Sequence, residues 1–288
     1  MGENAIVVEH LTFRYGNLTA VDHINFNVGA GEIMGFLGPN GAGKTTTAKM
    51  LTGQLRPQEG MAILLGHDVA RETGKVKSQI GVCFEQTNLY EQMSALDNLA
   101  LFAELFEVDN FDGYALLKRV GLAGREKDKV SGYSKGMKQR LMVARSLVNR
   151  PQIIFMDEPT AGLDPVSSEA IGNIILEERD RGATIFLTTH DMWEADKLCH
   201  RVAFMNQGKI AALDTPRNLK QQFGKRCLVA EVAGPGGGLE KREINMDSAD
   251  TAHAVEDLFR KEKVITIHSE EATLEDIFIK VTGRRLAE

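Results

Sequence analysis

The residues best suited to chemistry begin with a glycine-rich segment. Residues 38–45, GPNGAGKT, fit the pattern G-x-x-x-x-G-K-[ST], in which backbone N–H groups turn toward a phosphate. The segment follows the apolar run Ile33–Leu37 and precedes a helix that we expect to begin near Thr45. Lys44 can reach the β- and γ-phosphates of a nucleotide, and the Thr45 hydroxyl can ligate Mg²⁺. The alternative is a glycine-rich turn with an incidental lysine. The predicted nucleotide-binding residues of this segment are Gly38, Pro39, Asn40, Gly41, Ala42, Gly43, Lys44, Thr45 and Thr46.

Two carboxylates, Asp157 and Glu158, follow a second apolar run, Ile153–Met156. In an open parallel sheet, ligands bind outside the carboxyl ends of the strands. We therefore predict that Asp157 lies near the glycine-rich segment and holds Mg²⁺ through water. Glu158 can orient and deprotonate an attacking water, an effect worth roughly 10²–10⁴-fold. Alone, such a pair is more often the start of a solvated loop, and the nearby phosphate-binding pattern favours the functional interpretation.

Two further apolar runs end in polar residues. Ile80–Phe84 leads to Gln86, and Thr184–Leu187 leads to His190. Gln86 can contact Mg²⁺ or the attacking water, and His190 can hydrogen-bond the γ-phosphate. Singly, each residue would be structural, but four run ends that meet at one edge of a sheet favour a shared site. The predicted catalytic residues are Glu158, His190 and Gln86, and the predicted metal ligands are Thr45, Gln86 and Asp157.

These residues need a scaffold, and the apolar pattern predicts one. Short apolar runs bounded by polar residues are typical of strands covered on both faces, hence of a parallel sheet with helical crossovers. Ile6–Val8 and Ile24–Val28 instead alternate like half-buried strands. Residues 88–150 have a mostly helical pattern. We predict an α/β fold: a P-loop NTPase core with a parallel sheet, an N-terminal antiparallel β subdomain and a helical insertion.

The composition changes after Pro216, which predicts a second, smaller domain. The segment Gly234–Gly238 is expected to be the most flexible in the chain. Around it we predict a small α+β appendage. Its expected elements are strands at Cys227–Val232, Arg242–Ile244 and Val264–His268, and helices at 247–261 and Leu274–Val281. The predicted domains are residues 1–215, with a helical subdomain at about 88–150, and residues 216–288.

Composition excludes several classes of protein. The formal net charge is −6, which argues against nucleic-acid binding driven mainly by charge. The three cysteines follow no metal-ligand spacing, and such usage fits a reducing cytosol. No apolar run approaches the roughly 18–20 residues needed to span a bilayer. We therefore expect a soluble protein whose role at a membrane would need a partner.

Together these motifs resemble the nucleotide-binding subunit of an ABC transporter over roughly residues 5–215. The resemblance assigns Gln86 to the Q-loop, Asp157 and Glu158 to Walker B and its catalytic glutamate, and His190 to the switch histidine. Residues 161–164, ending in Asp164, match the D-loop. Tyr15, otherwise an ordinary strand aromatic, matches the residue that stacks on adenine. The resemblance implies ATP and Mg²⁺ as ligands, and two copies that pair head to tail.

Residues 133–140, YSKGMKQR, occupy the signature position, where the family commonly has L-S-G-G-Q. Ser134 and Gly136 are retained, and Lys135 replaces the first glycine. Ser134 is a good helix N-cap. The resemblance implies that Ser134 and the Gly136 N–H meet the γ-phosphate held by a second copy, while Lys135 adds positive charge nearby. The alternative is a helix that is merely capped.

The resemblance points to the exporter branch of the family, whose members include drug, sodium and polysaccharide exporters. It implies an ATP hydrolase that forms a homodimer on a separately encoded transmembrane permease, cytoplasmic and peripheral on the inner face of the cell membrane. Phe102 and Phe106 would line the groove for the permease or pack in the core. No nucleic-acid partner is expected. The competing hypotheses are a soluble ABC-type ATPase acting on ribosomes or nucleic acid, and a nucleotide-sensing module that does not hydrolyse ATP.

Overall fold

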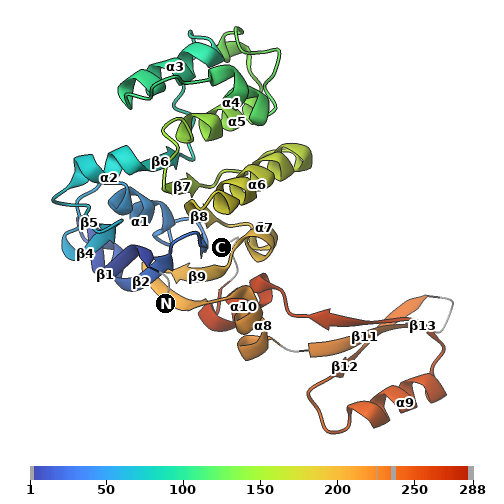
Figure 1. Cartoon of the computed structure of the whole chain (residues 1–288). Helices are drawn as coiled ribbons and strands as arrows, with labels where there is room; N and C mark the ends of the chain where they lie inside the picture. The colour runs from blue at the N-terminus through green and yellow to red at the C-terminus, as the bar shows by residue number, and fades with distance from the viewer. Residues whose placement is uncertain (1–2, 225, 235–237, 285–288) are drawn as a thin grey trace. The chain divides into compact units, whose positions relative to one another are not determined.

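The chain divides into two compact units, one ending at Leu213 and the other beginning at Asp214. The structure is a computed structural model that describes residues 3–224, 226–234 and 238–284 (Figure 1). Among these residues, no helix is long and apolar enough to cross a membrane.

The first unit is built around a six-stranded sheet in the order β10-β9-β3-β8-β7-β6. From β9 to β6 every pair of neighbours is parallel. Every residue of β3, β7 and β8 is buried, because helices and a second sheet cover both faces. The four continuous apolar runs predicted as strands are therefore confirmed as β3, β6, β7 and β8, whereas β9 and β10 were not predicted. The strands are β3 (Ile33–Leu37), β6 (Ile80–Cys83), β7 (Ile153–Asp157), β8 (Thr184–Thr189), β9 (Arg201–Asn206) and β10 (Lys209–Asp214).

A second, four-stranded sheet has the order β2-β1-β4-β5, and its neighbouring strands are antiparallel. Its first two strands are the alternating segments predicted near the N-terminus, each extended by several residues. Neither of the other two strands was predicted from the sequence. The strands are β1 (Asn4–Tyr15), β2 (Leu18–Gly29), β4 (Glu59–Leu64) and β5 (His67–Asp68).

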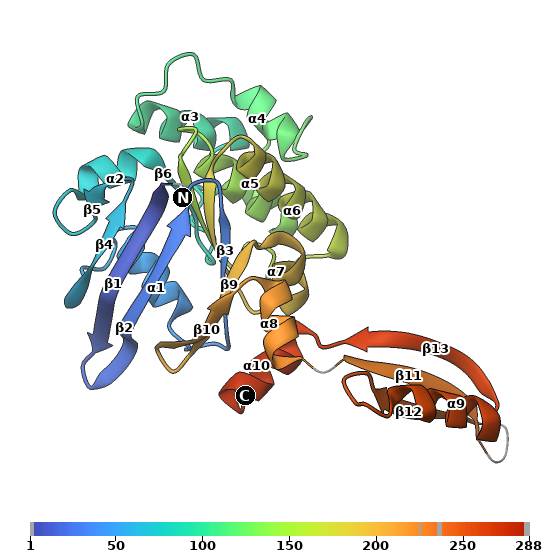
Figure 2. The ribbon, with the colours of Figure 1, turned by 60° about the horizontal axis from the view of Figure 1, so that its bottom comes forward.

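The main core of the unit lies between the two sheets. Helix α1 (Lys44–Leu51) contributes Met50 and Leu51 to it, and the ring centroids of Phe36 and Phe186 lie 4.6 Å apart in the same cluster. Figure 2 shows α1 and the antiparallel sheet on one side of the main sheet, with α5 (Lys135–Ser146) and α6 (Pro165–Asp180) on the other. This packing fixes the carboxyl end of β3 and the start of α1.

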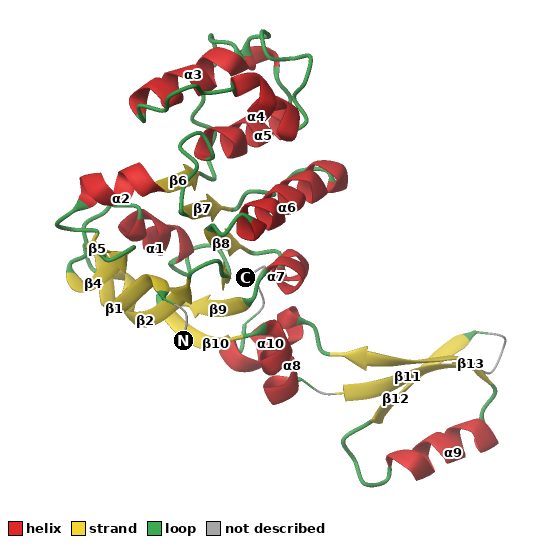
Figure 3. Ribbon diagram, viewed as in Figure 1, coloured by secondary structure: helices red, strands yellow, loops and turns green. Residues whose placement is uncertain are grey.

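A helical region joins β6 to β7, as predicted, but the regular helices cover only part of residues 88–150. Figure 3 shows the helices of this region gathered together, with loops between them. Ser94 and Asp112 cap two of these helices by accepting the backbone N–H groups of Asp97 and Ala115. The helices are α3 (Ala95–Leu105), α4 (Gly113–Arg119), a 3₁₀ turn at Val130–Gly132, and α5. Three further helices of the unit were not predicted: α2 (Thr73–Gln79), α6 and α7 (Met192–Leu198).

The second unit contains a three-stranded antiparallel sheet in the order β12-β11-β13. Leu258 of α9 packs on Ala230 and Val232 of the central strand. The predicted elements are present with shifted ends, and α8 was not predicted. Of the predicted flexible segment, residues 235–237 lie outside the described residues. The elements are α8 (Pro216–Phe223), β11 (Arg226–Ala233), β12 (Leu239–Asn245), α9 (Thr251–Lys261), β13 (Val264–Glu271) and α10 (Leu274–Thr282).

Candidate functional site

The order of the main sheet brings four of the predicted segments to one edge. Strands β3, β8, β7 and β6 are neighbours and run parallel, so their carboxyl ends meet there. The glycine-rich loop follows β3, and His190 follows β8. Asp157 is the last residue of β7, and Glu158 comes directly after it. Gln86 lies beyond β6 and is exposed.

Backbone atoms of two other strands lie very close to the glycine-rich loop. Gly43, the N-cap of α1, has a φ of 108°, and a Cβ there would lie 2.5 Å from the Ala20 carbonyl oxygen. A Cβ on Gly38 would lie 2.3 Å from the carbonyl oxygen of Met205. No larger residue fits either position without displacing backbone. The loop is therefore held in place by β2 and β9, in front of a helix N-terminus that favours anions.

Two of the residues predicted to act on phosphates are linked to carboxylates. Lys44 is 5% exposed, and its Nζ donates to the Gly38 carbonyl at 2.6 Å and lies 3.4 Å from Oε1 of Glu158. The Thr45 hydroxyl donates to Oδ1 of Asp157 at 3.2 Å. The hydroxyl of Thr188, on the neighbouring strand, donates to the same oxygen. The loop and the acidic strand end thus form one hydrogen-bonded group.

The oxygen atoms of Thr45 and Asp157 suit Mg²⁺, which prefers hard oxygen ligands and keeps several waters when substrate phosphates complete its shell. Among the described residues no group of three or more His, Cys, Asp or Glu side chains can hold a metal ion. A site made of one hydroxyl, one carboxylate and phosphate oxygens agrees with that observation.

Glu158 lies between a lysine and a histidine. Its Oε2 is 2.7 Å from Nδ1 of His190 and accepts the His190 backbone N–H at 3.3 Å. Its Oε1 is buried beside Lys44 and has no hydrogen-bond partner among the described residues. The backbone of Glu158 has a φ of 50°, a left-handed conformation that is uncommon for a residue with a side chain. Such strained positions often occur at functional sites. Since Oε1 accepts no hydrogen bond in the described part of the chain, it is the carboxylate oxygen left to accept one from water if Lys44 moves away.

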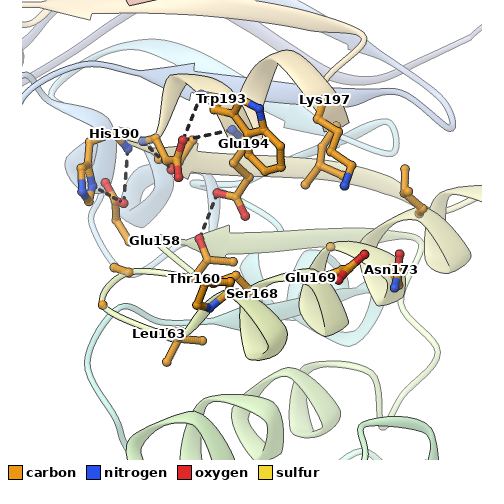
Figure 4. Close-up of a pocket in the computed structure, with 18 residues that line it drawn as sticks. Glu158, Thr160, Leu163, Ser168, Glu169, Asn173, His190, Trp193, Glu194 and Lys197 are labelled. Carbon is orange, nitrogen blue, oxygen red and sulfur yellow. Dashed lines mark hydrogen bonds and ion pairs between the residues drawn. The ribbon is translucent and has the colours of Figure 1, made fainter.

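A cavity of about 520 Å³ lies beside this pair. Figure 4 shows residues that line it. It is lined by Glu158 and His190 and extends to Thr160, Trp193 and Glu194. The Thr160 hydroxyl donates to Oε2 of Glu194 at 3.0 Å. Burial raises the pKa of Glu194 to about 6. Thr160, Trp193 and Glu194 were not predicted from the sequence, because no short motif marks them.

The signature segment begins a helix, as predicted. Ser134 is the N-cap of α5, and its hydroxyl oxygen accepts the Met137 N–H at 3.3 Å. Asp164 is the N-cap of α6 and accepts the N–H and hydroxyl of Ser167 at 2.9 and 2.7 Å. These two bonds hold the pKa of Asp164 below its usual value. Ser134 and Asp164 are both exposed.

Some predicted site residues are not brought to the Lys44–Glu158 group within one chain. No hydrogen bond in the described part of the chain joins Gln86, Ser134 or Gly136 to that group. Tyr15 ends β1, is 48% exposed, and packs edge-on against Phe13 with ring centroids 4.9 Å apart. These positions suit the assignment of Ser134 and Gly136 to a second copy, and they leave the roles of Tyr15 and Gln86 as predictions.

A glycine-rich loop that joins a buried parallel strand to a helix, with carboxylates at the carboxyl end of another strand of the same sheet, defines a P-loop nucleoside triphosphatase. The family described as "ABC transporter" matches residues 21–161. A fluoroquinolones export ATP-binding protein of Mycobacterium tuberculosis is 47% identical over 288 residues, 99% of this chain and 96% of that relative. The chain belongs to the ABC transporter family and is an ATP-binding subunit with the ATPase fold of that family.

Two further similarities agree with this assignment. Nod factor export ATP-binding protein I of Paraburkholderia xenovorans is 36% identical over 307 residues, 99% of this chain and 99% of that relative. A dimeric ATP-binding cassette, solved in a post-hydrolysis state with ADP and Pi, is similar with a TM-score of 0.68 and 25% identity. That similarity covers 73% of this chain and 98% of the cassette. The family and the fold predicted from the motifs are therefore confirmed.

Proposed function

We propose that this ATPase powers export through a separately encoded transmembrane permease. Two copies of the chain would close on ATP and reopen after hydrolysis, and that cycle would move the permease between its inward- and outward-facing states. The names of the relatives support export, since they refer to fluoroquinolones and Nod factors. Because those names cover different cargoes, we assign the selection of cargo to the permease.

The position of Glu158 carries the proposal for hydrolysis. Its Oε2 is held by His190 at 2.7 Å, while Oε1 is buried and without a hydrogen bond in the described part of the chain. We assign Glu158 as the general base that takes a proton from the attacking water. His190 would orient that carboxylate and hydrogen-bond the γ-phosphate. Gln86 would complete the group when the helical region moves it toward the water.

The glycine-rich loop would bind the phosphates, and Tyr15 would stack on the adenine. Thr45 and Asp157 would hold Mg²⁺, Asp157 through water and with Gln86 as a further ligand. When bound, the ion would neutralise charge on the phosphates. Lys44 would move from the Gly38 carbonyl and Glu158 to the β- and γ-phosphates. That movement would also free Glu158 from its 3.4 Å contact with the ammonium group.

We assign Ser134, Gly136 and Asp164 to the half of an ATP site that each chain offers to its partner. Ser134 and Asp164 are exposed and cap neighbouring helices, so both can contact a second chain. The similarity to a dimeric cassette supports this arrangement. The dimer would sit on the cytoplasmic side of the permease, at the inner face of the cell membrane. No nucleic-acid partner is proposed for a chain with a net charge of −6.

We further propose that residues 1–215 form the ATP-binding domain and residues 216–288 an accessory domain, a division close to the boundary between the two units. The helical subdomain would receive the permease. Phe106 is 36% exposed and is available for that contact, whereas Phe102 is half-buried with the Arg145 guanidinium 4.7 Å from its ring centroid. Of the two aromatic residues, Phe106 is therefore the better candidate for the groove.

Replacement of Glu158 by glutamine tests the proposed chemistry. Glu158→Gln should bind ATP and dimerise, but turn over at least about 10²-fold more slowly, because glutamine cannot accept the proton. The matched control is Glu275→Gln, since Glu275 is an exposed carboxylate on α10. Near-normal ATP turnover by Glu158→Gln would show that Glu158 is not the base.

Purification from detergent-solubilised membranes tests the partner. A multi-spanning protein that co-purifies with the tagged chain supports transport. Ribosomes or nucleic acid in its place would favour the competing function, a soluble ABC-type ATPase.

A further inference from the structure

Lys135 connects the signature segment to a loop that lies far from it in the sequence. Its Nζ donates to the carbonyl oxygen of Ala161 at 2.9 Å and to that of Gly162 at 3.4 Å. Both carbonyls belong to residues 161–164, which we call the D-loop, directly before α6. The lysine therefore joins the first turn of α5 to the backbone that leads into α6.

The two segments are in close contact around this link. A Cβ added to Gly162, whose φ is 65°, would lie 2.4 Å from Nζ of Lys135. A Cβ added to Gly136 would lie 3.0 Å from the hydroxyl oxygen of Ser167, in the first turn of α6. The starts of α5 and α6 thus fit against each other at two points, and the ammonium group lies at one of them.

The charge of Lys135 is not stabilised by its own helix. Lys135 is the first residue of α5, and a cation near a helix N-terminus is disfavoured by the helix dipole. The D-loop carbonyls offer the ammonium group partial negative charge that its own helix does not. Hydrogen bonds to a charged donor are also stronger than those between neutral groups. A glycine at this position, as in the common family pattern, would leave the D-loop without this connection.

We propose that Lys135 is a positioning residue that holds the signature turn and the D-loop of the same chain as one unit. The inference rests on the proposed function, in which both segments meet the ATP site of a second copy. If the two segments are already fixed relative to each other, less conformational entropy is lost when the dimer closes. Lys135 therefore favours ATP-driven dimerisation and has no direct part in nucleotide binding by one chain.

Dimerisation provides the first test, in the full-length Glu158→Gln protein. Lys135→Met keeps a long side chain but removes the charge and the donors. We expect it to raise the ATP concentration at half-maximal dimerisation about tenfold, as measured by sedimentation velocity. Lys135→Arg retains a charged donor, so its ATP concentration at half-maximal dimerisation should lie close to that of the Glu158→Gln parent. The matched control is Lys118→Met, since Lys118 is an exposed lysine of α4 that lies outside the signature segment and the D-loop. The control should leave the ATP midpoint unchanged.

Hydrogen exchange in the ATP-free chain provides a second, independent test. The Ala161 and Leu163 amides donate within the D-loop turn, to the Glu158 and Thr160 carbonyls at 3.2 and 3.1 Å. Lys135→Met should speed exchange of these two amides, because the loop opens more often without the lysine. The melting temperature and the affinity of the single chain for ATP should stay the same, which a general loss of structure would not allow.

The outcomes separate this inference from the proposed function. If the Glu158→Gln parent fails to dimerise with ATP, the proposed function is wrong, while faster exchange in Lys135→Met would still support the link between the segments. If the parent dimerises and Lys135→Met has the same ATP midpoint and the same exchange rates, Lys135 is not a positioning residue.

Discussion

Nδ1 of His190 lies 2.7 Å from Oε2 of Glu158, and this contact follows from the register of two neighbouring parallel strands. Asp157, the last residue of β7, pairs with Thr188 of β8, so the residues just beyond these strands lie side by side. The Glu158 N–H donates to the Thr188 carbonyl at 3.0 Å and holds the left-handed backbone at Glu158. Strand pairing thereby places the proposed base beside the residue that orients it.

Replacement of His190 by alanine should slow hydrolysis without preventing ATP binding. The change removes one of the groups that hold Glu158, together with the proposed contact to the γ-phosphate. Loss of a single positioned donor typically lowers kcat by about 10²–10³-fold. Steady-state ATPase assays and titration with a fluorescent nucleotide would measure the two effects. His253→Ala, at an exposed position of α9, is the control and should be normal. A His190→Ala enzyme with wild-type kcat would remove His190 from the site.

Replacement of Ser134 by arginine should abolish both ATP-driven dimerisation and hydrolysis. Ser134 is exposed at the start of α5, so a larger side chain is tolerated in the single chain but blocks the γ-phosphate of the partner. Loss of the N-cap also costs about 1 kcal/mol of stability. Nucleotide binding by the monomer should be largely intact. Sedimentation with ATP checks this prediction, and dimers that persist in Ser134→Arg would show that the signature assignment is wrong.

Much of this fold could be predicted because its strands are fully buried. β3 and β7 are apolar at nearly every position, and β8 has the apolar run Ile185–Leu187 between threonines, so these strands stand out from the sequence around them. The first half of β4 is exposed, and its Glu59 and Gly60 carry no strand signal. Helix α6 was not predicted, although Asp164 followed by Pro165 is a typical helix start. An N-cap residue followed by proline thus predicts a helix start that the apolar pattern alone does not reveal.

Some contacts of the site could likewise be predicted from the sequence, and others could not. A motif predicts residue types along one strand end, such as Asp157 and Glu158. A motif does not predict that the carbonyl oxygens of Ala20 and Met205 lie close to the glycine-rich loop, because those atoms belong to strands distant in the sequence. The Lys135 contact likewise depends on how α5 and α6 pack. Tertiary contacts of this kind leave no local pattern in the sequence.

Removal of Mg²⁺ should stop hydrolysis, and Thr45→Ala should weaken the response to the metal. Thr45 and Asp157 share a hydrogen bond of 3.2 Å, and their oxygens are the proposed ligands. Chelation by EDTA should abolish ATP turnover, and added Mg²⁺ should restore it. In Thr45→Ala the Mg²⁺ concentration for half-maximal activity should rise about tenfold. Thr282→Ala, in the C-terminal unit, serves as the control. An ATPase activity insensitive to EDTA would contradict a metal at this position.

Replacement of Glu194 by glutamine should stabilise the protein, and the gain should depend on pH. Burial raises the pKa of this carboxyl to about 6 from the 4.5 of an exposed glutamate, so the folded state binds more protons than the unfolded state between these values. As the pH rises from 4.5 to about 6, ionisation of Glu194 therefore lowers the free energy of unfolding, and this loss of stability persists above pH 6. Glutamine carries no charge and can still accept the Thr160 hydroxyl.

The expected gain for Glu194→Gln is about 2 kcal/mol at pH 8 and about 1 kcal/mol at pH 5, and it vanishes below about pH 4. Urea unfolding at the two higher pH values would measure it. Glu104→Gln, at an exposed position of α3, should change stability little at either pH. A gain that is the same at pH 5 and pH 8 would mean that the carboxyl of Glu194 does not titrate with a raised pKa. Because Glu194 lines the same cavity as Glu158 and His190, the ATPase activity of this variant near pH 6 would also show whether the buried charge affects hydrolysis.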